Sequence, residues 1–102
     1  MTLGAQLKEL SDGILDLLLK TKDVEEKRRL RKQLTEVHEQ TAHLVDTNVD
    51  AATEAYADAT ASLNESIRAI REAQADLGHV ARTISKIAKA IRLVEQVVGT
   101  VT

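Results

Sequence analysis

The chain of 102 residues lacks cysteine and proline, and it has almost no aromatic side chains. Without cysteine, disulfide bonds, thiolate metal sites and cysteine nucleophiles are excluded. Tyr56 is the single aromatic residue. Because β-domains use aromatic side chains in their strands and glycine or proline in their turns, an all-β fold is disfavoured. The abundant residues are Ala, Leu, Glu, Lys and Arg, which predict a single all-α domain over residues 1–102.

Long hydrophobic runs are also missing. No uninterrupted apolar stretch reaches the ~18 residues that a membrane-spanning helix needs. The first residues do not show a basic segment followed by an apolar one, which is the pattern of a secretory signal. We therefore expect a cytoplasmic protein, with export that uses no cleaved signal as the alternative.

Charges of opposite sign are separated along the chain. Residues 1–19 carry −2, residues 20–32 carry +4, residues 33–67 carry −7 without any Lys or Arg, and residues 68–102 carry +3. The net charge of −2 conceals this separation. Because opposite blocks can pair when a chain folds back, the pattern favours helices packed side by side.

Apolar residues recur at helical spacing from the start of the chain. Leu3, Leu7, Leu10 and Ile14 are separated by four and three residues, which predicts a first helix over about residues 3–20. Asp23, with Glu26 three residues later, is a candidate N-terminal cap for the next helix.

A longer repeat follows, in which steps of four and three alternate strictly over eight heptads. Such a repeat predicts a left-handed coiled-coil seam, since 3.5 residues per turn keep one stripe facing a partner. Its members are Val45, Val49, Ala52, Tyr56, Ala59, Leu63, Ser66, Ile70, Ala73, Leu77, Val80, Ile84, Ile87, Ile91, Val94, Val98 and Val101.

The position of the turn is decided by charge pairing. A turn near residue 62 places Glu39 opposite Lys86 and Glu54 opposite Arg71, whereas a turn near residue 47 sets acids against acids. We therefore predict a long antiparallel coiled-coil-like hairpin with arms at about 23–61 and 63–100, and keep residues 46–48 as the alternative turn. The helix over residues 3–20 is expected to pack on the end of the hairpin away from the turn.

Catalytic and metal sites are not predicted. His38-Glu39 and His43 have the spacing HExxxH, and the extra residue relative to the zinc-protease motif moves the second histidine off the first one's face. Glu39, His43, Asp46 and Asp50 do share a helix face, but a solvated acidic surface explains them better than a metal site. No phosphate loop and no serine–histidine–acid set can be assembled, so we expect no enzyme, no cofactor and no resident metal.

Two segments could serve other partners. Residues 20–32 hold seven basic side chains, but three acids in the same stretch and the lack of aromatic residues for base stacking argue against nucleic acid. Residues 80–98 form an amphipathic helix that could lie on a membrane surface. The unbroken heptads favour a packed helix instead.

The resulting expectation is a non-enzymatic structural or adaptor protein that acts by helix–helix association, as a homo-oligomer or as a small subunit of a larger complex. The alternative is a membrane-active or exported helical-hairpin protein that uses residues 80–102. The expected interaction surface is the alanine-rich half of the seam, with Tyr56 as its anchor. It comprises Val49, Ala52, Tyr56, Ala59, Leu63, Ile67, Ile70 and Leu77.

In length and expected hairpin architecture the chain resembles the small secreted proteins of bacterial type VII export. Those proteins have a Trp-x-Gly turn, and this chain has Ser62-Leu63-Asn64 at the corresponding place. Their C-terminal Tyr-x-x-x-Asp/Glu signal has no counterpart here either. The resemblance is therefore one of architecture, without a shared motif.

Overall fold

Four α-helices account for nearly all of the residues that the computed structural model describes, which are residues 3–45 and 54–99. The helices are α1 (Leu3–Lys20), α2 (Val24–Val45), α3 (Glu54–Ala75) and α4 (Val80–Gly99), with a short 3₁₀ segment, η1 (Leu77–His79), between the last two. The described part of the chain is thus all-α, as its composition predicts.

The turn between α1 and α2 is closed by side chains. Thr21 donates twice to the main-chain oxygen of Leu17 at the end of α1, from its N–H at 2.9 Å and from Oγ1 at 2.7 Å. The Asp23 carboxylate accepts from the main-chain N–H of Glu26 at 2.9 Å and so caps the start of α2. The predicted first helix and the predicted cap at Asp23 are both confirmed.

The predicted turn near residue 62 is wrong, because residues 54–75 form one continuous helix. Ser62 and Leu63 lie buried in the middle of α3, where the chain has no glycine or proline to stop it. The chain reverses instead at Asp76, whose extended backbone and carboxylate, bonded to the N–H of Gly78 at 3.0 Å, start η1. The arms at 23–61 and 63–100 are therefore replaced by two hairpins, α1–α2 and α3–α4. The alternative turn at residues 46–48 lies outside the described residues.

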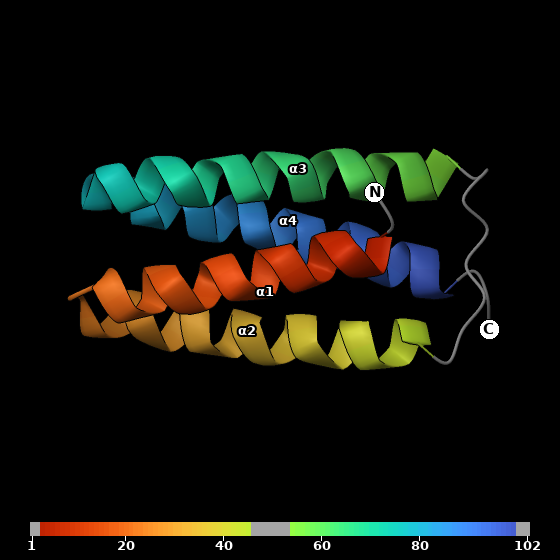
Figure 1. Cartoon of the computed structure of the whole chain (residues 1–102), viewed down its shortest axis with the longest axis horizontal. Coiled ribbons are helices and arrows are strands. Elements are labelled where there is room, and N and C mark those ends of the chain that lie inside the picture. Colours follow the sequence, from red (N-terminus) through yellow and green to blue (C-terminus); the bar gives the residue numbers. More distant parts are fainter. Residues whose placement is uncertain (1–2, 46–53, 100–102) are drawn as a thin grey trace.

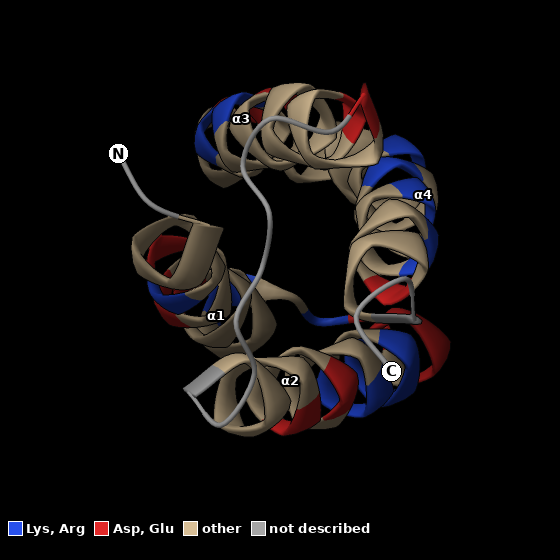
Figure 2. Cartoon of the chain, turned by 90° about the vertical axis from the view of Figure 1, so that its right-hand side faces the viewer, with Lys and Arg blue, Asp and Glu red and all other residues tan. Residues whose placement is uncertain are grey.

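The helices form a ring in the order α1, α2, α4, α3, as the view along the bundle shows (Figure 2). Within each hairpin the helices are antiparallel, whereas α1 runs parallel to α3 and α2 runs parallel to α4 (Figure 1). Hydrogen bonds confirm the parallel direction, since Gln33 reaches Ile84 and Gln40 reaches Ile91 at the same offset. α2 and α3 lie diagonally across the ring.

The first helix does not take its expected place. We expected it to cover only one end of a long hairpin, but α1 runs along α3. The main-chain N–H of Leu3 donates to the Tyr56 hydroxyl at 3.1 Å, and Gly13 lies against Ile70. The ion pairs of Lys86 and Arg71 also differ from those expected. Lys86 pairs with Glu65 at 3.3 Å and not with Glu39, and Arg71 pairs with Glu9 at 3.2 Å and not with Glu54.

The heptad seam does identify the buried faces of α3 and α4. From Ala59 to Val94 its members are buried, with the exception of Leu77, which lies in the turn. The pattern stays in phase across the break because Ala73 and Val80, on either side of it, are seven residues apart. A continuous seven-residue repeat therefore does not require a continuous helix. The core that it shares with α1 and α2 includes Leu7, Leu10, Ile14, Leu17, Leu30, Val37, Leu63, Ile87 and Val94.

Candidate interaction surface

The large aliphatic side chains that remain exposed in the described chain lie at one end of the bundle. They are Leu15, Leu19, Val24 and Leu77. α1 ends and α2 begins at this end, and η1 joins α3 to α4 there (Figure 1). Leu19 is 75% exposed and Val24 is 81% exposed, so neither contributes much to the fold.

Leu15 and Leu19 are one helical turn apart, on the side of α1 that faces away from α3. The adjoining flank of α1 carries Glu9, Asp12 and Asp16, which line a groove against α3. Leu15 lies about 100° around the helix from Asp16. Because only residues 21–23 separate the two helices, exposed Val24 at the start of α2 lies at the same end of the bundle as Leu19.

Basic side chains accompany these aliphatic ones. Val24 and Arg31 share a stripe of α2, seven residues apart, and Lys27 lies half-buried between them. Lys22 occupies the turn. We name Leu15, Leu19, Lys22, Val24, Lys27 and Arg31 the turn-end patch.

Two acidic residues near the turn-end patch, Glu25 and Asp23, are already engaged. Arg28 donates to the Glu25 carboxylate at 2.5 Å, and Arg29 approaches the same oxygen at 3.5 Å. The hydrogen bond from Arg28 is the main reason why the pKa of Glu25 is lowered, and it raises the pKa of Arg28 in return. Asp23 caps α2. Within the described ranges, Lys22, Lys27 and Arg31 have no ion pair, so the patch keeps its positive charge.

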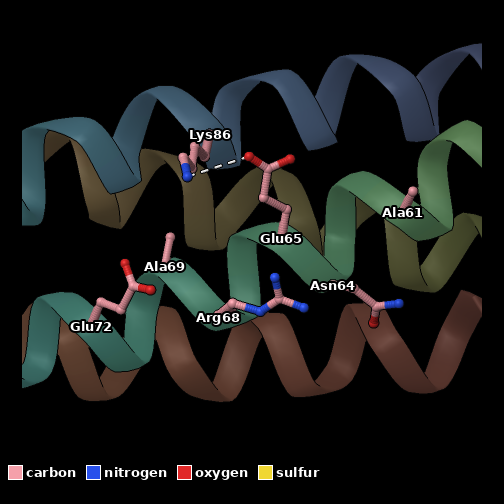
Figure 3. A pocket seen from close by; sticks show the side chains of 7 residues that line it. All are labelled: Ala61, Asn64, Glu65, Arg68, Ala69, Glu72 and Lys86. Atoms are coloured by element: carbon pink, nitrogen blue, oxygen red, sulfur yellow. Dashed lines mark ion pairs between the residues drawn. The ribbon is translucent and has the colours of Figure 1, made fainter.

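A polar groove of about 390 Å³ lies between α3 and α4 (Figure 3). Glu65 and Lys86 point toward one another across it and form an ion pair at 3.3 Å. Arg68 and Glu72 follow along α3, and Asn64 and the small side chains of Ala61 and Ala69 complete the lining. Charges of both signs alternate along this groove, and it offers little apolar surface to a ligand.

The residues considered for metal binding divide between two parts of the chain. Glu39 and His43 lie near the end of α2, whereas Asp46 and Asp50 fall outside the described residues. In the described ranges, no three His, Asp or Glu side chains cluster closely enough to hold a metal ion.

The structure places most of the expected interaction surface inside the chain's own core. Ala59, Leu63 and Ile70 are buried, since α3 packs on both α1 and α4. Tyr56 and Ile67 are partly buried against the same core. Leu77 is exposed, and Val49 and Ala52 lie outside the described residues.

The turn-end patch was missed by the sequence reasoning, although the sequence holds a signal for it. Residues 14–19 read ILDLLL, and helical periodicity buries only one stripe of such a run. Ile14 and Leu17 take the core positions. Leu15 and Leu19 therefore fall on the outer side of α1. Leucines on an outer helix face indicate an interaction surface.

The apolar face of α4 is not available to a membrane in this fold. Its members Val80, Ile84, Ile87, Ile91 and Val94 are all buried. Within the described ranges, no helix has a segment long and apolar enough to cross a membrane.

Comparison of the chain with protein-family models, curated proteins and solved structures finds no match.

Proposed function

We propose that this chain is a non-enzymatic adaptor or small structural subunit that acts by helix–helix association, and that it binds a protein partner through the turn-end patch. The observation that carries the proposal is the high exposure of Leu19 and Val24 beside the α1–α2 turn, while the seam of the bundle is internally covered. Exposed aliphatic side chains that gather in one place are typical of an interaction site.

The size of the patch limits the expected affinity. Fully burying an aliphatic side chain is worth ~1.5–3 kcal/mol, and Leu15 is already half-buried. Three such residues give a few kcal/mol, whereas micromolar binding requires about 8 kcal/mol net of the cost of association. Charged contacts must therefore supply part of the binding, and a transient complex is expected.

Among the forms of helix–helix association, a foreign partner is better supported than self-association. The expected self-association surface around Leu63 and Ile70 is covered by the chain's own helices. A membrane-active role of α4 would require the bundle to open, since its apolar face is part of the core.

The proposal is tested by placing a photo-crosslinking amino acid at residue 19 in the native host. We expect one predominant protein adduct from this position. The same amino acid at Ser85, an exposed residue of α4, is the matched control and should give no such adduct. An equal adduct pattern from both positions, or none from residue 19, would refute the proposal.

A further inference from the structure

The chemistry of the turn-end patch indicates what kind of partner it binds. It combines three exposed or half-exposed aliphatic side chains with Lys22, Lys27 and Arg31. Residues 20–32, which supply most of the patch, hold seven basic and three acidic side chains, so its net charge is positive. Asp12 and Asp16 lie on the adjoining flank of α1 and line the groove against α3. A complementary surface is therefore aliphatic along its centre and acidic around it.

The shape of the patch favours a helix as the binding element. α1 and α2 lie side by side and antiparallel (Figure 1), so the patch draws its side chains from two neighbouring helices. Leu15 and Leu19 are four residues apart on one helix, and Val24 and Arg31 are seven apart on the other. A helix with aliphatic residues at spacings of three and four matches this periodicity and can pack on such a helix pair.

We propose that the turn-end patch binds an acidic amphipathic helix of a partner protein. This inference rests on the proposed function and adds the chemical class of the partner. In the complex, aliphatic residues of the partner helix contact Leu15, Leu19 and Val24. Glutamates or aspartates on its flanks pair with Lys22, Lys27 and Arg31, which have no ion pair within the described chain.

A second copy of the chain fits the patch less well. Two patches facing each other would bring like charges together, which is unfavourable. A head-to-tail contact would need an aliphatic surface elsewhere on the bundle. In the described residues, the other exposed large aliphatic side chain is Leu77, which lies at the same end.

A lipid surface is also less well matched. Helices that bind at membrane interfaces present an extended apolar face, which commonly includes aromatic side chains. The chain has no Trp and no Phe, and Tyr56 lies near Leu3, at the opposite end of α1.

The test uses two synthetic three-heptad peptides with Leu at the a and d positions. One carries Glu at the flanking positions and the other carries Lys. Binding to the intact, isotope-labelled chain is followed by fluorescence anisotropy and by amide chemical shifts. We expect the acidic peptide to bind at least about tenfold more tightly than the basic one. Its shifts should centre on residues 15–31, and its affinity should fall with salt.

Leu19→Glu is expected to weaken binding of the acidic peptide by about tenfold. Ser85→Glu adds the same charge elsewhere and should change the affinity much less. Leu19→Gln, which adds no charge, separates loss of aliphatic contact from repulsion. Circular dichroism should show that all three variants keep the fold, because both positions are exposed.

Equal binding of the two peptides, shifts centred elsewhere, or no binding of the acidic peptide would overturn the inference. Anionic vesicles that recruit the chain in a Leu19-dependent way while the peptide does not would assign the patch to lipid. Concentration-dependent dimerisation through Leu19 would assign it to a second copy. A crosslinked partner that is basic at its contact site would overturn the partner class alone and leave the proposed function standing.

Discussion

Gln33 donates its side-chain N–H to the main-chain oxygen of Ile84 at 2.8 Å, across the contact between α2 and α4. Gln40 makes the same bond to Ile91, seven residues further along both helices. Gln6 reaches from α1 to Asn64 of α3 at 2.7 Å. In the described chain, the Oε1 atoms of these three glutamines are buried without a hydrogen-bond partner, and all three lie between the two hairpins.

Replacement of Gln33 by Leu keeps a similar volume and removes both the buried Oε1, which accepts no bond, and the hydrogen bond to Ile84. Stability is expected to rise, because an unsatisfied buried acceptor costs about 1–3 kcal/mol and a typical hydrogen bond contributes about 0.5–1.5 kcal/mol. The expected gain is about 1 kcal/mol, or roughly 4–8 °C in Tm for a domain of this size. Gln96→Leu, at an exposed position of α4, is the matched control and should leave Tm nearly unchanged. Thermal unfolding measures both, and a loss of stability in Gln33→Leu would contradict the expectation.

The double variant Gln33→Leu/Gln40→Leu should gain stability, but α2 and α4 should no longer be held in a single packing register. Buried polar pairs at heptad spacing select one register, because other registers leave their donors unpaired. We expect broader amide spectra and a population of oligomers in the double variant. A single set of sharp resonances from a monomer would show that the aliphatic seam alone selects the register.

Engineered cysteines test the parallel contact between α1 and α3, and the cysteine-free chain provides a clean background. Gln6→Cys with Asn64→Cys should form a disulfide within one chain under mild oxidation. Glu54→Cys with Arg71→Cys should not do so, because both lie on α3, about 25 Å apart at ~1.5 Å per residue. Mass spectrometry of the oxidised, digested protein distinguishes these outcomes, and the reverse result would restore a turn near residue 62.

Gly13 lies at the close approach of α1 and α3. A Cβ at this position would lie 3.2 Å from Ile70 Cδ1. Gly13→Ala should therefore realise little of the ~1 kcal/mol that alanine normally adds to a helix interior. Gly4→Ala is the matched control, since a Cβ there meets nothing within 4 Å, and it should stabilise more. Ile70→Val should lower the free energy of unfolding less in Gly13→Ala than in the parent chain. A double-mutant cycle by denaturant unfolding would measure this difference.

Glu25 provides a test in solution of the charge arrangement beside the patch. The pKa of its carboxyl is lowered, chiefly by the hydrogen bond from Arg28. Stability from this contact is present above the unfolded-state pKa and is lost as the pH falls through the lowered folded-state pKa. In Arg28→Ala the pKa of Glu25 should move back toward its ordinary value, as NMR titration of the carboxyl carbon would show. An unchanged pKa would mean that Arg28 does not hold this carboxylate in solution.

The sequence predicts which residues of each helix face inward, but it does not predict which helix they face. The stripe from Leu3 to Ile14 and the seam from Ala59 to Val94, apart from Leu77, are buried as expected, because helical periodicity alone selects the inner face. The seam runs in phase through the turn at Asp76–His79, so periodicity could not reveal that break. Weak surface charge pairs, used to place the turn, did not decide it.

By itself, then, the sequence determined the all-α class, the first helix with the cap at Asp23, and the inward faces of the helices. Only the tertiary structure decided the ring order, the parallel contacts between the hairpins and the exposure of Leu19 and Val24. The physical reason is that aliphatic seams are nearly interchangeable as partners, since burial depends on area and not on identity. Partner choice depends on contacts between distant residues, such as Gly13 with Ile70 and Gln33 with Ile84.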